Sequence, residues 1–157
     1  FGKEVLEQCK EDDVIENVKA IREFAGDRAV LRAFHFFEEN KRVDAEVEAL
    51  EKKDFATFFN KITESGDSSW KWLQNCYCNE TPDEQSITVA LALTKLYLDK
   101  IGRGVCRVHG GGFAGVIAAF LPKEETEGFT KYIDKALGEG SAYVMHIRPQ
   151  GAVKVEF

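Results

Sequence analysis

Hydrophobic residues recur at helical spacing through about the first hundred positions of the chain. Apolar side chains separated by three and four residues are typical of a helix with one buried face. This pattern predicts helices over about residues 13–25, 28–52, 55–63 and 82–99. In the third helix, an apolar stripe is expected to face the core rather than to line a ligand pocket; it comprises Phe55, Phe58, Phe59 and Ile62.

Polar residues and glycines predict where these helices begin and end. The expected N-caps are Asp13, Asp27, Asp54 and Thr81. Glu16 follows Asp13 at the spacing of a capping box, and Pro82 with Glu84 would fill the first turn after Thr81. Gly26 and Gly102 are expected to end helices. The polar segment Glu64–Ser69 predicts a break after the third helix.

The pattern changes after Gly104, where short alternating runs replace the helical spacing. Strands are predicted at Val105–Val108, Val116–Leu121, Ser141–Arg148 and Ala152–Phe157, with a helix over about residues 129–137 between the second and third. Helices and strands that are segregated along a chain indicate the α+β class. We therefore expect one domain over residues 1–157, with a helical first part followed by a four-stranded, mostly antiparallel sheet.

Charge and composition narrow the choice of partners. The net charge of −6 argues against nucleic acid and against an anionic membrane surface. No apolar run approaches the roughly 20 residues that a membrane-spanning helix requires. A disulfide framework would normally be denser and the domain smaller, so we expect the four cysteines to be reduced thiols of a cytoplasmic protein. The usual zinc spacings are absent, so we expect no metal. Because the first residue is Phe1, we expect the chain to be part of something longer.

The most distinctive stretch is Gly104–Pro122, which holds five of the 13 glycines. A glycine run between two strands can be a plain tight turn, or it can present backbone N–H groups to an anion, and spacing alone leaves both open. His109, just before the run, could act as a general base or phosphate donor, or could simply face the turn. The sequence has neither the G-x-S-x-G of an esterase nor the GK[ST] of a P-loop.

The same stretch, CRVHGGGFAGVIAAFLP, resembles the third signature of the GHMP sugar kinases, and most closely that of galactokinases. The matching residues are Arg107, Gly110, Gly112, Phe113 and Gly115, with Gly111 at the variable small position. Upstream elements of the family also match, at Glu39, Asn40 and Arg42, at Ala49, Leu50, Asp54 and Phe55, and at Glu64 and Ser65. A closing P-x-x-G-A element is similar at Pro149, Gly151 and Ala152. His109 and Ala114 depart from the family pattern, and so does the segment after Ser65, so the resemblance leaves the sugar open.

This resemblance implies a ferredoxin-like C-terminal domain of a galactokinase-like enzyme that uses ATP and Mg²⁺ to form galactose 1-phosphate. The catalytic motifs of that family belong to the N-terminal half and do not occur in this chain, so no catalytic or metal-binding residue is expected here. ATP, Mg²⁺ and the sugar would be bound together with that other half, which is the implied partner. The implied residues beside phosphate and sugar are His109, Gly110, Gly111, Gly112, Phe113 and Gly115. The alternatives are a GHMP kinase for another sugar or small alcohol, and a non-catalytic galactose sensor.

Overall fold

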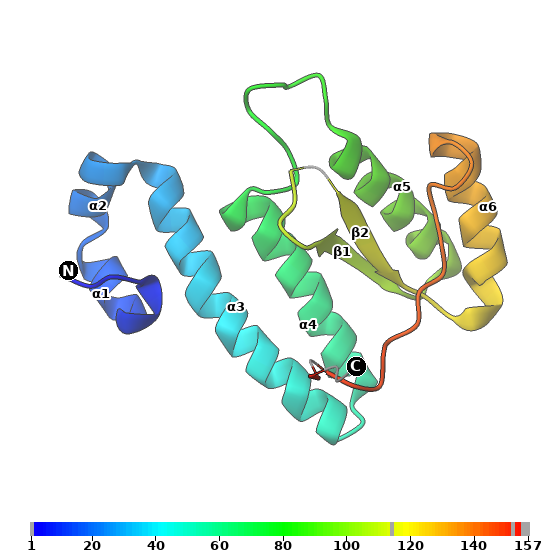
Figure 1. Cartoon of the computed structure of the whole chain (residues 1–157), viewed down its shortest axis with the longest axis horizontal. Helices are drawn as coiled ribbons and strands as arrows, with labels where there is room; N and C mark the ends of the chain where they lie inside the picture. The colour runs from blue at the N-terminus through cyan, green and yellow to red at the C-terminus, as the bar shows by residue number, and fades with distance from the viewer. Residues whose placement is uncertain (1, 114, 152, 155–157) are drawn as a thin grey trace. The chain divides into compact units, whose positions relative to one another are not determined.

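The computed structural model describes residues 2–113, 115–151 and 153–154 (Figure 1). It divides into two compact units, Phe1–Leu121 and Pro122–Phe157, which are described separately. The elements of the first unit are η1 (Leu6–Gln8), α1 (Glu11–Glu16), α2 (Val18–Ala25), α3 (Asp27–Glu51), α4 (Phe55–Ser68), η2 (Ser69–Leu73), α5 (Ser86–Ile101), β1 (Val105–His109) and β2 (Val116–Phe120). The second unit contains η3 (Lys123–Glu125) and α6 (Thr126–Leu137). None of the described helices is long and apolar enough to cross a membrane.

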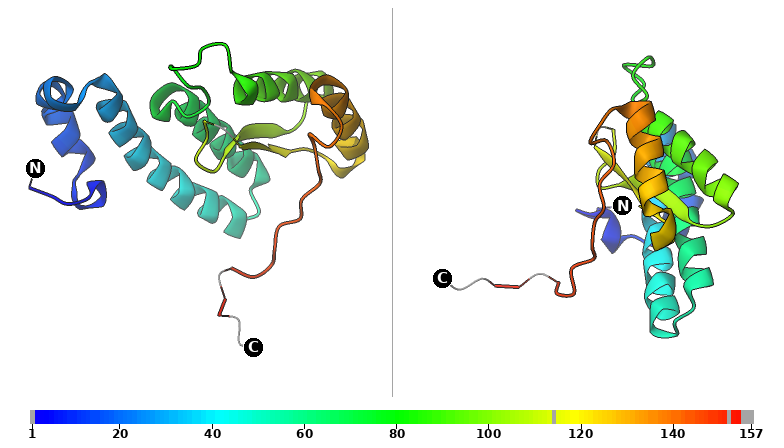
Figure 2. Two further views of the ribbon diagram at one scale, coloured as in Figure 1. Left: turned by 45° about the horizontal axis from the view of Figure 1, so that its top comes forward. Right: turned by 90° about the vertical axis from the view of Figure 1, so that its right-hand side faces the viewer.

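Helices α3 and α4 form a hairpin at the centre of the first unit (Figures 1 and 2). The prediction of a single long helix over about residues 28–52 is confirmed by α3. The chain then reverses at Lys53, whose φ of 57° is left-handed. The predicted cap Asp54 is also confirmed, because its carboxylate accepts a hydrogen bond of 3.1 Å from the backbone N–H of Thr57.

The N-terminal helices depart from the expected caps. A single helix beginning at Asp13 is wrong, because α1 begins two residues earlier and Lys10 occupies the N-cap position. Asp13 is instead the box partner, and its carboxylate accepts from the N–H of Lys10 at 2.8 Å. Asn17 interrupts the helix, and its side chain donates to the carbonyl of Asp13 at 2.8 Å. Gly26 (φ 83°) ends α2 as expected, but it also takes the N-cap position predicted for Asp27.

The predicted break at Glu64–Ser69 is wrong. Helix α4 continues to Ser68 and passes directly into the π-helical turn η2. A Cβ on Gly66 would lie 3.1 Å from the Cβ of Arg107 and 3.3 Å from the carbonyl oxygen of Cys106. The glycine that suggested a break therefore allows α4 to approach β1 closely. The apolar stripe of α4 is only partly in the core, since Ile62 is buried while Phe55 is exposed.

The predicted start of the fourth helix at Thr81–Glu84 is also wrong. The backbone carbonyl oxygen of Thr81 accepts from the N–H of Glu84 at 3.0 Å, which closes a turn, and α5 begins at Ser86. These residue types favour turns as well as helix caps, so their sequence pattern did not distinguish the two. The end of the helix at Gly102 is confirmed, with φ of 68°.

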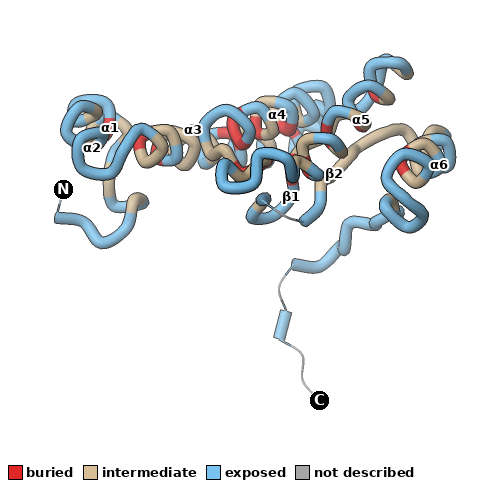
Figure 3. Tube along the Cα trace, turned by 90° about the horizontal axis from the view of Figure 1, so that it is seen from above, coloured by how far each residue is buried: buried red, intermediate tan, exposed pale blue. Residues whose placement is uncertain are grey.

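Strands β1 and β2 form an antiparallel pair that lies between α4 and α5 in Figure 1. Their pairing runs from Val105 opposite Phe120 to His109 opposite Val116, which confirms the two predicted strands on either side of the glycine run. The core beneath them consists of Cys76, Ile87, Leu91 and Val108. A separate cluster of Val14, Val30 and Ala33 joins α1 to α3. In Figure 3 buried positions gather around α4, beside β1.

In the second unit, α6 confirms the predicted helix over residues 129–137. The predicted strand Ser141–Arg148 is not formed, because no described segment pairs with it, and its apolar side chains are exposed. Of the last predicted strand, residues 152 and 155–157 lie outside the described part, and Val153 and Lys154 are not in a strand. The sheet over the described residues therefore has two strands rather than the expected four.

Candidate functional site

The glycine-rich segment forms the connection between β1 and β2. Three of its glycines adopt positive φ, namely Gly110 (72°), Gly112 (76°) and Gly115 (137°). Phe113 shares this conformation (φ 61°), which is unusual for a bulky residue, and its side chain is 47% exposed. His109 ends β1 and is exposed beside this loop. The structure therefore brings the predicted site residues together at one end of the hairpin.

The loop is held by Asn75, a residue that the sequence pattern did not indicate. The N–H of Phe113 donates to the carbonyl oxygen of Asn75 at 2.6 Å. The Asn75 side chain donates from Nδ2 to the carbonyl oxygen of Gly111 at 3.3 Å. A Cβ on Gly112 would lie only 2.2 Å from the Asn75 carbonyl oxygen, so this contact requires glycine. Asn75 lies 36 residues before Gly111 in an irregular segment and has no periodic signal.

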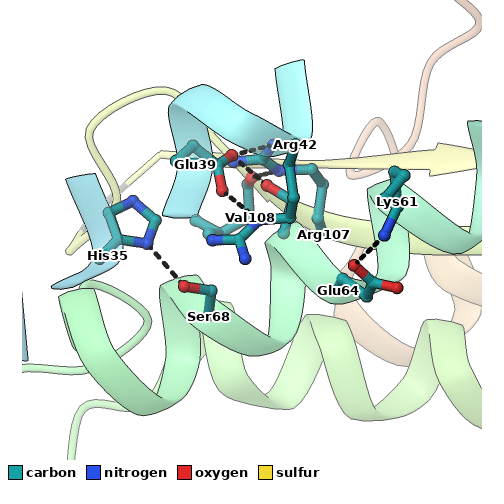
Figure 4. A network of polar contacts seen from close by, with 9 residues as sticks. His35, Glu39, Arg42, Lys61, Glu64, Ser68, Arg107 and Val108 are labelled. Atoms are coloured by element: carbon teal, nitrogen blue, oxygen red, sulfur yellow. Dashed lines mark hydrogen bonds and ion pairs between the residues drawn. The ribbon is translucent and has the colours of Figure 1, made fainter. Parts of the chain in front are cut away.

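A second cluster of polar groups joins α3, α4 and β1 around Glu39 (Figure 4). Arg42 donates from Nε to Glu39 Oε2 at 2.9 Å, within the same helix. Ser65 donates its hydroxyl to Glu39 Oε1, and Arg107 Nη1 donates to the same oxygen at 3.2 Å. Three separate sequence elements of the family resemblance therefore meet at one carboxylate. Glu64 lies apart from this cluster and pairs with Lys61 at 2.7 Å.

Burial and the neighbouring arginines shift the pKa of the Glu39 carboxylate in opposite directions. Burial alone raises the pKa of Glu39, but the hydrogen bonds from Ser65 and Arg42 and the charge of Arg107 outweigh it and lower the pKa. Glu46, one helical repeat further along α3, has a raised pKa because of burial and the nearby charge of Glu39. Glu39 therefore stays ionised as the partner of two arginines.

His35 lies one turn before Glu39 and shares a hydrogen bond of 2.9 Å between its Nδ1 and the Ser68 hydroxyl (Figure 4). Burial lowers the pKa of His35, although the charge of Glu39 acts the other way. Burial therefore favours the neutral form of the imidazole. Ser68 is buried at the end of α4, so this pair is placed to join two helices rather than to attack a substrate.

Metal binding has no support in the part of the chain that the structure describes. No group of three His, Cys, Asp or Glu side chains lies close enough there to hold an ion. All four cysteines are free thiols. Burial raises the pKa of both Cys76 and Cys106, which disfavours the thiolate that a metal requires. The chemistry available at the loop is therefore that of backbone amides, His109 and an exposed phenyl ring.

Comparison with known proteins gives a consistent set of relatives. The chain is 31% identical over 136 residues to a galactokinase of Glaesserella parasuis serovar 5 (strain SH0165), an alignment that covers 85% of this chain and 32% of the relative. It is 30% identical over 146 residues to a galactokinase of Haemophilus influenzae (strain PittGG), covering 81% and 34%. A galactokinase of Actinobacillus pleuropneumoniae serotype 3 (strain JL03) is 30% identical over 136 residues, covering 85% and 32%. No protein-family model matches the chain.

These similarities support a galactokinase-like relationship. The chain spans about a third of the length of the curated relatives that it matches.

Proposed function

We propose that this chain is the C-terminal part of an ATP-dependent sugar kinase that converts galactose to galactose 1-phosphate. The observation that carries the proposal is the meeting of Glu39, Arg42, Ser65 and Arg107 around one carboxylate. These residues come from three separate elements that resemble galactokinase motifs, and the strand that carries Arg107 leads directly into the glycine-rich loop. The similarity to galactokinases over more than four-fifths of the chain supports the same proposal.

In this proposal the loop lines the cleft beside the transferred phosphate and the sugar. Phosphoryl transfer depends mainly on positioning and on stabilisation of charge, rather than on covalent chemistry by the protein. Backbone amides at Gly110, Gly111 and Gly112 can supply part of that stabilisation if the loop is held rigidly. ATP and Mg²⁺ would be bound mainly by the N-terminal half of the enzyme, which is the principal partner of this chain.

A sugar kinase of this kind also implies a domain assignment and a cellular location for the chain. We assign residues 1–157 to one GHMP-type C-terminal domain of a cytoplasmic enzyme. Both outer edges of the β1–β2 pair lack a partner strand among the described residues, and we propose that further strands complete a ferredoxin-like sheet in the full enzyme. A crystal structure of the complete protein tests this arrangement directly.

A kinase assay on the complete natural protein tests the activity. We expect galactose-dependent release of ADP in the presence of ATP and Mg²⁺, with galactose 1-phosphate identified by ³¹P NMR. Glucose, mannose, N-acetylgalactosamine and mevalonate form the comparison panel, since His109 and Ala114 depart from the family pattern. Turnover of another member of the panel, but not of galactose, would favour a kinase of different specificity. Binding of galactose and ATP without turnover would favour a sensor.

A further inference from the structure

We propose that Asn75 is a positioning residue that fixes the conformation of the glycine-rich loop for phosphate binding. The structural part of this inference stands on the contacts of Asn75 alone, and its catalytic consequence rests on the proposed kinase function. The residue is buried, with 2% of its surface exposed, although its side chain is polar. A buried amide requires hydrogen-bond partners, and it finds one on the loop.

The loop is attached to Asn75 at three consecutive residues. Gly111 offers its carbonyl oxygen to the side chain, and Phe113 donates its N–H to the main chain. Between them, Gly112 approaches so closely that a Cβ would also lie 2.7 Å from Nδ2 and 2.8 Å from the Cβ of Asn75. The loop thus packs closely on one residue, which restricts it in addition to the two flanking strands.

Asn75 is itself held on both sides. The carbonyl oxygen of Gln74, the preceding residue, accepts a hydrogen bond of 3.0 Å from Arg28 on α3. Cys76, the following residue, is buried in the core beneath β1, and its carbonyl oxygen accepts from the Thr88 hydroxyl at 3.0 Å. The segment therefore connects the loop to α3 and α5.

Strained backbone occurs on both sides of this contact. Gln74 (φ 56°) and Phe113 (φ 61°) are two of the three described non-glycine residues with positive φ. The π-helical turn η2 ends at Leu73, directly before Gln74. Such conformations persist only where surrounding contacts impose them, and they concentrate at functional sites.

A held loop matters for the chemistry because amides stabilise developing charge only when they are already oriented. Without the Asn75 side chain, Gly111 loses the contact that fixes its peptide plane. The strands would still pair from His109 and Val116 onward, so the fold would remain while the loop amides became disordered. The loop can therefore lose its order in a variant that still folds, and exchange of its amides can detect this.

The first test is amide hydrogen exchange of this chain, followed by NMR, for the wild type and for Asn75→Ala and Asn75→Asp. Both variants remove the Nδ2 donor. Alanine leaves a small cavity, whereas aspartate keeps the shape but adds a charge opposite the Gly111 carbonyl oxygen, so whichever variant folds carries the test. We expect exchange at Phe113, whose N–H is bonded to the Asn75 carbonyl oxygen, to accelerate about tenfold in both, with exchange in α3 and α5 unchanged. Asn79→Ala, an exposed asparagine four residues away, is the matched control. Unchanged exchange at Phe113 in a folded variant of either kind would overturn the inference.

The second test measures steady-state kinetics of the complete natural protein with galactose and ATP. We expect Asn75→Ala to lower kcat about tenfold while KM for galactose changes less than about twofold, because the amides act on developing charge. Equal loss of kcat in the Asn79→Ala control would contradict a specific role. If the wild-type protein transfers no phosphate, the proposed function fails, and the exchange result alone still decides the structural part.

Discussion

Arg107 on β1 and Glu39 on α3 form an ion pair of 3.2 Å across 68 residues of sequence. Both side chains are largely shielded, with 25% and 21% of their surfaces exposed. The pair fixes the strand that precedes the glycine-rich loop against the longest helix of the chain. Because Arg42 and Ser65 share the same carboxylate, its removal affects three elements at once.

Glu39→Gln should therefore destabilise the chain more than an ordinary surface substitution. The change removes the carboxylate with which both Arg42 and Arg107 form ion pairs, and Arg42 is buried. We expect the free energy of unfolding to fall by about 2–4 kcal/mol, measured by urea denaturation monitored by circular dichroism.

Glu48→Gln is the matched control, because Glu48 makes the same kind of pair with Lys52 on the exposed side of α3. We expect no measurable change there, since exposed pairs contribute little. Similar losses in the two variants would show that the Glu39 cluster is no more than a surface ion pair.

Adjacent glycines of the loop should respond differently to alanine. Gly112→Ala places a Cβ at 2.2 Å from the Asn75 carbonyl oxygen and requires a positive φ, so we expect a loss of at least about 2 kcal/mol. At Gly111 a Cβ meets nothing within 4 Å, and the backbone is not in the left-handed region, so Gly111→Ala should change stability by less than about 0.5 kcal/mol. Thermal unfolding of the two variants checks this, and equal effects would contradict the described loop conformation.

Acidification should weaken the fold partly through His35. Its pKa is lowered in the folded chain, so the unfolded chain binds more protons once the pH falls below the ordinary value of about 6.5. The contribution to stability is thus complete above that value and is lost as the pH falls through the lowered pKa. Urea denaturation at several pH values between about 7 and 5 should show a smaller loss for His35→Asn than for the wild type.

Glu46 is present in both the His35→Asn variant and the wild type, so its contribution to the pH dependence of stability cancels when the two are compared. Its raised pKa acts in the opposite sense to the lowered pKa of His35. His146→Asn, at an exposed histidine of the second unit, should behave as the wild type does. A His35→Asn variant with the wild-type pH dependence would rule out the buried imidazole as the cause.

The isolated chain should show no kinase activity. It contains the proposed loop but none of the catalytic motifs that the galactokinase resemblance assigns to the N-terminal half. We expect no galactose-dependent ADP release from this chain in a coupled assay with ATP and Mg²⁺. Activity in purified chain that survives removal of contaminating kinases would require a catalytic residue within residues 1–157.

Hydrophobic periodicity correctly predicted the helices and strands that have one apolar side and one polar side. Helices α3 and α6 and the pair β1–β2 appear where the apolar spacing placed them. The helix starts at Asp13 and Thr81 were wrong because one residue type serves in caps, boxes and turns. The segment Glu64–Ser69 was misread because its helix is stabilised by partners distant in sequence. Ser65 binds Glu39, and Gly66 fits against β1.

Part of the candidate site could likewise be predicted from the sequence, and part could not. The loop could be recognised from its glycine content, because backbone positions with positive φ favour glycine. The sequence does not indicate Asn75, because its role arises from tertiary contacts with residues 36 or more positions away. A single buried asparagine in an irregular segment has no period and no motif, so only the folded chain reveals it.

The burial of Cys76 gives this chain an intrinsic reporter of loop movement. The thiol is 1% exposed and follows Asn75 directly, and burial raises its pKa. The thiolate is the form that attacks an alkylating reagent, so labelling at this position should be slow while the segment is closed. Peptide mass spectrometry can distinguish it from Cys9, Cys78 and Cys106, and thus follow opening of the loop anchor without any introduced dye.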